Sequence, residues 1–239
     1  YEIYQCDWSS DVCSSDLCAA GFSDSPHFMY SGYDKNGEWY QLYQITFGGI
    51  PGKPFGDGPD GHSLWPSFTN VPNEFLESYF PLRIDIYETI VDTGGAGKNR
   101  GGNGLRIGYR FLEPGEISIH DDRWLTYPWG ANGGEPGVRS RKLLQRANGT
   151  AELLPSKIDH VKVEAGDLLI ADTWGGGGWG DPLEREAEKV AVDVEAGLVS
   201  VAGARRYGVV IATDGSVDAA ATTALRAEMS KKRGKKKIF

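Results

Sequence analysis

The sequence predicts an α+β fold, with a β-rich body interrupted by glycine-rich loops and with helices concentrated in the C-terminal fifth. Short segments that alternate polar and apolar residues recur up to residue 180, and this alternation is typical of half-buried strands. After residue 181 the apolar residues take a helical spacing instead. The 33 glycines gather in clusters, at residues 47–61, 94–104, 130–137 and 175–180.

Two segments carry the clearest strand pattern of the body. Residues 38–47 are rich in Tyr, Trp and Ile, and in residues 82–91 alternate positions place Ile84, Ile86, Glu88 and Ile90 on one face. Further strands are expected at residues 105–112, 116–119, 161–163 and 167–171. Glycine clusters between such strands mark tight turns or ligand-binding loops, and turns are the commoner case.

The C-terminal part begins with a helix start signal. Asp181 can cap a helix, and Pro182 suits its first position. Val190, Val194 and Leu198 then fall on one helical face. We expect a helix or turn at residues 200–206, a short strand at 207–212, a turn at Asp214-Gly215 and a last helix at 217–231.

Charge and hydropathy exclude two classes of partner. The 239 residues, 40% of them hydrophobic, suffice for one sizeable core or two small ones. The net charge is −8, and because residues 231–237 hold six of the 25 basic residues, the remainder is near −14, which argues against nucleic acid. Since no apolar run is long enough to span a bilayer, we expect no membrane insertion. Residues 231–239 are expected to form a basic, disordered tail.

The first 17 residues do not resemble a protein segment. Back-translated, residues 6–17 can be written as the common end of a sequencing-library indexing primer, and residues 1–3 fit its preceding bases. We therefore interpret residues 1–17 as translated adapter and exclude them, so that the domain comprises residues 18–230. All three cysteines lie at or before Cys18, a pattern that excludes a disulfide scaffold and fits a reducing cytoplasm.

The glycine-rich segment 94–104 is the best candidate for a loop that binds a substrate or an anion. Exposed backbone N–H groups beside Lys98 and Arg100 would form a positive concavity, to which Asp92, Gly95 and Gly97 would also belong. It is not a Walker A loop, because Asp92 and Asn99 stand where that motif needs Gly and Ser or Thr. The alternative is a structural turn between two strands.

Two further clusters contain His and Asp residues. Asp57, Asp60 and His62 lie in one loop rich in Gly and Pro, where they would bind a divalent metal or transfer protons, although Asp and Gly also simply form turns. The residues at 120–122, His-Asp-Asp, are expected to form a surface strand end, because neighbouring strand residues point to opposite faces.

Several segments, taken in order, resemble the hydantoinase B / 5-oxoprolinase family. Residues 68–77 resemble its Thr-Asn-x-Pro-x-Glu-x-x-Glu segment, and residues 92–104 are similar to its most distinctive stretch, Asp-Ser-Gly-Gly-Ala-Gly-x-x-Arg-Gly-Gly-x-Gly. Residues 175–185 and 204–210 resemble its closing segments. Because members of the family are usually more than twice as long, we expect this chain to be a C-terminal fragment.

The resemblance implies an ATP-dependent hydrolase of cyclic amides, such as hydantoin or 5-oxoproline. A hydantoinase A-type partner would bind ATP and Mg²⁺, and the small cyclic amide would be phosphorylated on its carbonyl oxygen. A divalent metal is possible in the complete protein, with ligands largely outside this fragment, for which we expect no cofactor of its own and no catalytic activity. The alternatives are a subunit of an acetone- or acetophenone-type carboxylase, and a non-catalytic docking scaffold.

Overall fold

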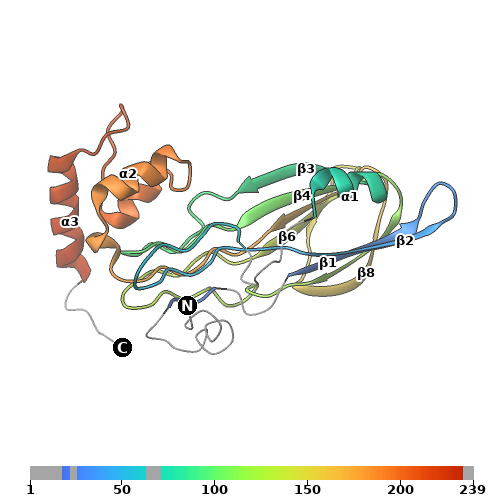
Figure 1. Cartoon of the computed structure of the whole chain (residues 1–239), viewed down its shortest axis with the longest axis horizontal. Helices are drawn as coiled ribbons and strands as arrows, with labels where there is room; N and C mark the ends of the chain where they lie inside the picture. Colours follow the sequence, from blue (N-terminus) through green and yellow to red (C-terminus); the bar gives the residue numbers. More distant parts are fainter. Residues whose placement is uncertain (1–17, 22–25, 63–70, 234–239) are drawn as a thin grey trace, which may run out of the picture.

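The computed structural model describes residues 18–21, 26–62 and 71–233 (Figure 1). The segment interpreted as adapter, the Thr-Asn pair at 69–70 and the last six residues of the expected tail lie outside these ranges. Within them, none of the helices has the length and apolar character required to cross a membrane.

Two antiparallel sheets form the body, as the predicted α+β class requires. One has the strand order β2-β1-β5-β8 and the other the order β3-β4-β9-β6-β7. The strands of the first sheet are β1 (His27–Tyr33), β2 (Trp39–Ile45), β5 (Gly115–His120) and β8 (Lys157–Val163). Those of the second are β3 (Leu82–Thr89), β4 (Leu105–Phe111), β6 (Arg141–Gln145), β7 (Ala151–Leu153) and β9 (Leu168–Asp172).

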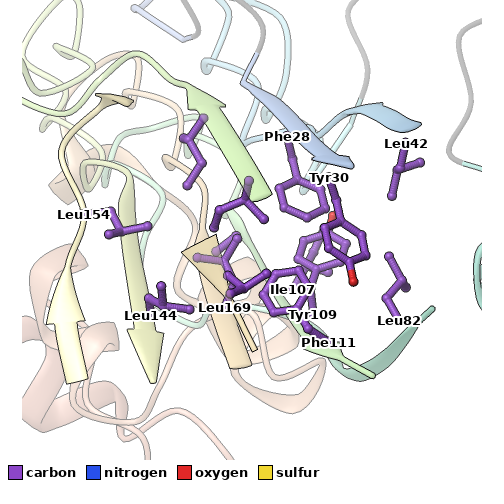
Figure 2. Close-up of a cluster of buried hydrophobic side chains, with 14 of the residues drawn as sticks. Phe28, Tyr30, Leu42, Leu82, Ile107, Tyr109, Phe111, Leu144, Leu154 and Leu169 are labelled. Carbon is purple, nitrogen blue, oxygen red and sulfur yellow. The ribbon is translucent and has the colours of Figure 1, made fainter. Parts of the chain in front are cut away.

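The main hydrophobic core joins the facing sides of these two sheets (Figure 2). Phe28 of the first sheet stacks on Tyr109 of the second with ring centroids 4.4 Å apart, and Tyr30 meets Phe111 at 4.9 Å. All four side chains are buried, and each contributes roughly 1.5–3 kcal/mol by leaving water. Contacts between aromatic rings thus hold the two sheets together.

The expected strands at residues 38–47, 82–91, 105–112, 116–119, 161–163 and 167–171 are all found, with ends shifted by a few residues. The predicted face of the strand at 82–91 fails in part. A β-bulge between Ile84 and Ile86 shifts its register, and Glu88 is exposed and pairs with Arg106 at 3.6 Å. Strand β5 ends at His120 as expected, but the expected surface position is wrong for Asp121, which is buried and pairs with the buried Lys142.

Four extended segments leave the sheets and run side by side toward the C-terminal helices (Figure 1). We call them the glycine bundle: residues 48–58, 93–104, 128–138 and 173–180. The central segment shows how it is built. Backbone N–H groups of its four successive glycines, residues 175–178, donate in order to the carbonyls of Val138, Gly102, Ala20 and Glu135, at 3.0, 2.8, 2.8 and 2.9 Å.

Gly175 and Gly178, which are three residues apart, donate to the same neighbouring segment, at Val138 and Glu135. The direction of the hydrogen bonds therefore repeats every third residue. A chain with three residues per turn has this period, and it leaves no direction free for a side chain. A Cβ atom on Gly176 would overlap the carbonyl oxygen of Ile50, and one on Gly101 would overlap that of Gly176. Close approach of the backbones therefore explains why glycine clusters at these positions.

Helical elements cover the far end of the bundle. They are the 3₁₀ turns η2 (Pro182–Glu184) and η3 (Gly203–Tyr207) and the helices α2 (Ala187–Glu195) and α3 (Ala219–Arg233). As expected, Asp181 caps the first turn, by accepting a hydrogen bond from the Leu183 N–H at 2.9 Å. A second core, which includes Val190, Tyr207 and Val209, packs α2, η3 and the chain after η3 around Ala96 of the bundle.

Besides the strands β1, β6 and β7, which the sequence did not predict, three elements differ from expectation. The predicted strand at 207–212 is absent, since η3 ends at Tyr207 and only an isolated bridge joins Ile211 to Val217. A short helix, α1 (Asn73–Tyr79), packs beside β3 and inserts Leu76 into the main core, outside the C-terminal fifth. Helix α3 runs to Arg233, so the tail boundary expected at residue 231 lies within a helix.

Candidate functional site

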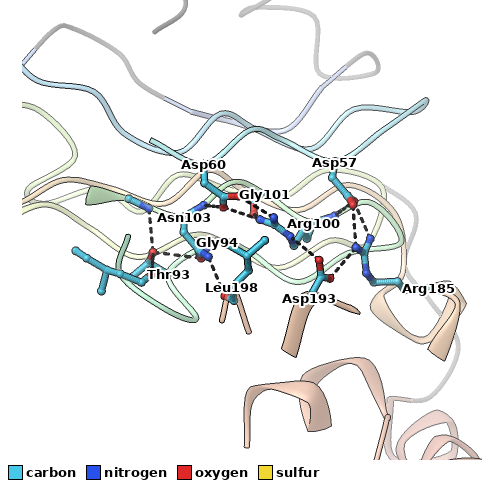
Figure 3. A network of polar contacts seen from close by, with 12 residues as sticks. Asp57, Asp60, Thr93, Gly94, Arg100, Gly101, Asn103, Arg185, Asp193 and Leu198 are labelled. Atoms are coloured by element: carbon cyan, nitrogen blue, oxygen red, sulfur yellow. Dashed lines mark hydrogen bonds and ion pairs between the residues drawn. The ribbon is translucent and has the colours of Figure 1, made fainter. Parts of the chain in front are cut away.

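A chain of alternating Arg and Asp side chains lies where the glycine bundle meets helix α2 (Figure 3). Arg100 donates two hydrogen bonds to the Asp60 carboxylate, Nη1 to Oδ1 and Nη2 to Oδ2, both at 2.8 Å. Its Nε lies 3.4 Å from Oδ1 of Asp193, on α2. Arg100 therefore joins the loop of Asp60 to the helix through one guanidinium.

Arg185 makes the second half of this Arg–Asp network. Its Nη1 and Nη2 donate to the two oxygens of Asp57 at 2.7 and 2.8 Å, and Nη2 also reaches Oδ2 of Asp193 at 2.8 Å. The guanidinium carbon lies 5.8 Å from the ring centroid of the buried Tyr207. Asp193 is thus shared by both arginines.

The network is largely removed from solvent. Side-chain exposure is 7% for Arg100, 2% for Arg185 and 10% for Asp193, but 35% for Asp57. Burial alone would lower the pKa of both arginines, yet the paired carboxylates outweigh it and raise both. Burial likewise would raise the pKa of Asp57, but the bonds from Arg185 and from the Arg100 N–H lower it. Arg100, Arg185 and Asp57 are therefore held in their charged forms.

The Arg–Asp network has a structural role. Three carboxylates and two guanidiniums leave one net negative charge, and each of these groups is paired within the network, although the buried Arg185 Nε has no hydrogen-bond partner. Ion pairs of this kind add little net stability, but removing one partner is expensive because it leaves the other charge buried and alone. The network therefore fixes α2 against the bundle.

Asp92 and Asn103 extend the attachment. Asp92 has a left-handed backbone, with φ of 64°, and its carboxylate accepts a hydrogen bond from the Ser200 N–H at 2.9 Å. The Asn103 side chain accepts from the Gly94 N–H and donates to the Leu198 carbonyl, both at 2.8 Å. Both residues thus tie the segment 92–104 to the chain that follows α2.

The backbone of residues 94–104 does not form the expected open concavity. Gly95 donates its N–H to Gly176, Lys98 to Gly180, and Arg100 to the Asp57 carboxylate, at 2.7, 3.2 and 2.7 Å. Gly97 lies against the backbone of Trp179. Most donors of the segment are therefore used inside the bundle, and they cannot also bind an anion.

The predicted residues are brought together only in part. Arg100 meets Asp57 and Asp60, while the Lys98 side chain is exposed and makes no ion pair among the described residues. His62 is exposed, and its N–H donates to the Gly48 carbonyl at 3.1 Å. The two aspartates face arginines and do not cluster with His62.

These residues do not fit a divalent metal. The carboxylates of Asp57 and Asp60 are occupied by guanidinium groups. In the part of the chain that the structure describes, no group of three or more His, Cys, Asp or Glu side chains is placed to hold a metal ion. No step of a reaction can be assigned to a metal held by these residues.

Asp193 was not identified from the sequence. It lies three residues after Val190, and both are buried on the same side of α2. A carboxylate at that position of an apolar helical face must be paired, because an unpaired buried charge is costly. This position is the signal by which Asp193 could have been found, whereas its partners Arg100 and Arg185 come from distant segments.

Comparison with known proteins identifies the family. The family model described as Hydantoinase B/oxoprolinase matches residues 7–182. The B-type subunit of a putative D-/L-hydantoinase from Pseudomonas sp. strain NS671 is 34% identical over 213 residues, which are 87% of this chain and 36% of that protein. The beta subunit of the Pseudomonas jessenii caprolactamase is 36% identical over 161 residues, 64% of this chain and 27% of that protein.

Solved structures agree with this result. The crystal structure of the ATP-dependent caprolactamase from Pseudomonas jessenii matches 91% of this chain and 40% of that one, with a TM-score of 0.73 and 28% identity. Nucleotide-free acetone carboxylase matches 90% of this chain and 34% of that one, also with a TM-score of 0.73, but at 24% identity it shows the fold alone. The chain spans little more than a third of the hydantoinase relative. By sequence and fold it belongs to the Hydantoinase B/oxoprolinase family.

Proposed function

We propose that this chain is part of the hydantoinase B-type subunit of an ATP-dependent enzyme that opens a cyclic amide, hydantoin or 5-oxoproline. The match to the family over residues 7–182 carries this proposal. Relatives named as hydantoinase, caprolactamase and 5-oxoprolinase support the substrate class, because all three names denote cyclic amides. The expected site of action is the cytoplasm.

The chemistry would be divided between two subunits. A hydantoinase A-type partner would bind ATP and Mg²⁺ and phosphorylate the amide carbonyl oxygen, which turns a poor electrophile into a good one. Two relatives are themselves named as one subunit of a larger enzyme, which supports the existence of a partner. In keeping with this division, the backbone donors of residues 94–104 are paired internally and offer no phosphate-binding loop.

The described residues would contribute a rigid frame to this enzyme. The glycine bundle and the Arg–Asp network connect the sheets to the C-terminal helices through backbone contacts and charge pairs. This observation also favours the second candidate, a scaffold that only docks the partner subunit. The two candidates differ in whether any exposed side chain of the bundle influences turnover.

Lys98 allows the two candidates to be separated. It is exposed and lies outside the network, so Lys98→Ala should leave the melting temperature unchanged. In the full-length protein, assembled with its partner, a functional loop predicts at least a tenfold fall in kcat/KM, about 1.4 kcal/mol of transition-state stabilisation. The exposed Lys189 of α2 is a matched control, and Lys189→Ala should leave kcat/KM unchanged.

The substrate is tested in the same assembly. Phosphate release with ATP and Mg²⁺ is measured in the presence of 5-oxoproline, of hydantoin, or of acetone with bicarbonate. The proposal expects turnover of a cyclic amide by the assembly and none by this chain alone. Turnover of acetone only would assign the chain to a ketone carboxylase, and an unchanged rate in Lys98→Ala would favour the scaffold.

A further inference from the structure

Arg123 is a buried arginine that lacks the carboxylate partner of the other buried arginines. The residue is 8% exposed, and its Nε donates to the Gly21 carbonyl at 2.6 Å. Its guanidinium lies over the ring of Trp129, 5.0 Å from the ring centroid. Among the described residues no carboxylate forms an ion pair with it, whereas Arg100 and Arg185 each have two.

The pKa of Arg123 is shifted in the opposite direction from the pKa values of Arg100 and Arg185. Burial lowers the pKa of Arg123, and the charge of the neighbouring Asp122 offsets this only in part. The pKa of Arg100 and that of Arg185 are raised, because their carboxylates outweigh the same effect of burial. Buried charges in proteins are normally paired, whereas among the described residues Arg123 has only this partial offset from Asp122 and no ion pair.

The backbone holds Arg123 in an unfavourable conformation. Its φ of 56° lies in the left-handed region, which a non-glycine residue with a long side chain rarely adopts. The Arg123 carbonyl accepts a hydrogen bond from the Ser140 N–H at 3.1 Å, and the Nε bond to Gly21 fixes the other end of the residue. Strain of this kind persists only where the surrounding structure maintains it, and it clusters at active sites, ligand clamps and switch regions.

The same loop presents a surface that suits an organic anion. Trp129 and Tyr127 are 52% and 50% exposed, and Leu125 is 82% exposed. Arg139 lies over the Tyr127 ring, with its guanidinium carbon 4.5 Å from the centroid. A planar guanidinium pairs with both oxygens of a carboxylate, and the exposed rings beside it would cover the rest of the ligand.

We propose that Arg123, stacked on Trp129, forms a binding site for a carboxylate. The carboxylate would belong either to a small organic acid or to an Asp or Glu side chain of polypeptide packed against this loop. The chemistry is the same in both cases, and the two sources differ in the size of the ligand that binds. The site goes beyond the proposed function and does not depend on it.

Thermal melts of the chain test the proposal, with sodium acetate compared with sodium chloride at equal ionic strength. Acetate should raise the melting temperature of the unsubstituted chain by about 2 °C or more, because a ligand that binds only the folded state stabilises it. The rise should disappear in Arg123→Met and persist in Lys189→Met, a control at an exposed cation of α2 outside the proposed site. Arg123→Met in chloride should melt slightly lower than the unsubstituted chain, because the hydrogen bond to Gly21 and the contact with Trp129 are lost, so the acetate effect is read as the difference between the two salts within each variant.

If Arg123→Met does not fold, a second variant, Arg123→Lys, tests the same proposal. Arg123→Lys keeps the charge but loses the paired N–H groups, so the acetate effect should be at least halved. A short peptide of glutamates distinguishes the sources: a rise at a lower carboxylate concentration than acetate requires indicates a polypeptide ligand, and an equal requirement indicates a free acid. The proposal is overturned if neither ligand raises the melting temperature, or if both raise that of Arg123→Met equally.

Discussion

The two ends of this molecule are held together by opposite means. Between the sheets, large side chains fill the space, and Tyr30, Tyr109 and Phe111 are completely buried there. In the glycine bundle the side chain is absent, and neighbouring backbones bond directly, as Gly176 does with Gly102 at 2.8 Å. Stability in the sheets depends on burying apolar area, whereas in the bundle it depends on keeping side chains out.

This contrast predicts a different response to the same small change. Adding or removing one methylene between the sheets can be absorbed in part, because side chains change rotamer. Backbones in direct contact cannot respond in that way without breaking their hydrogen bonds. A methyl group in the bundle should therefore be more harmful than the loss of a whole ring in the core.

The largest effect is expected for Gly176→Ala. The new Cβ would overlap the Ile50 carbonyl, so the bundle must open, and we expect a loss above about 4 kcal/mol. Phe111→Ala, by comparison, should lose about 3–5 kcal/mol through the cavity that it leaves. Urea unfolding followed by circular dichroism would measure both.

Gly56→Ala is the matched control for the bundle. No atom lies within 4 Å of a Cβ at Gly56, so this change should alter stability by less than about 1 kcal/mol. If Gly176→Ala unfolds at the same urea concentration as Gly56→Ala, the stability of the bundle does not depend on keeping side chains out.

An intermediate effect is expected for Asp193→Ala. The substitution removes the carboxylate shared by Arg100 and Arg185 and leaves two buried guanidiniums with one partner each. Breaking a buried pair in this way typically costs about 3–5 kcal/mol, and Asp60 and Asp57 should reduce this to the lower end. Differential scanning calorimetry should show a lower melting temperature. A melting temperature equal to that of the unsubstituted chain would show that the network does not hold the helices.

The smallest effect is expected for Asp57→Asn, and it should depend on pH. Because Arg185 lowers the pKa of Asp57 below 3.8, the carboxylate stabilises the fold above that value and loses its contribution as the pH falls through the folded pKa. The variant should therefore be less stable at neutral pH, and the difference should shrink in acid below pH 3.8. Urea midpoints across this range measure the difference. A difference that stays constant with pH would assign the role of Asp57 to its hydrogen bonds alone.

The sequence predicts the sheets and helix α2 better than it predicts the glycine bundle. The strands β2, β4 and β9 and the helix α2 were predictable because apolar residues report the side on which they are buried. The bundle has no such pattern, since its threefold repeat lies in the backbone hydrogen bonds. From the sequence alone its glycines therefore predict loops, and the segment 94–104 stays open between an anion-binding loop and a structural turn.

The candidate site was predictable only as separate residues. The sequence singles out Arg100, Asp57 and Asp60, but nothing in the local sequence shows that they meet or that each carboxylate faces an arginine instead of a metal. The decisive partners, Arg185 and Asp193, are supplied by segments far along the chain. Ion pairing over such sequence distances depends on the fold itself.

The backbone contacts of the glycine bundle also bear on how this protein tolerates genetic change. Every amino acid that a single-base substitution can put in place of glycine carries a Cβ atom. At Gly101, Gly102 and Gly176 that atom would meet a carbonyl group of a neighbouring segment, whichever residue is introduced. Missense changes at these three positions have no conservative form, so variation in the bundle should be confined to positions such as Gly56, where space remains.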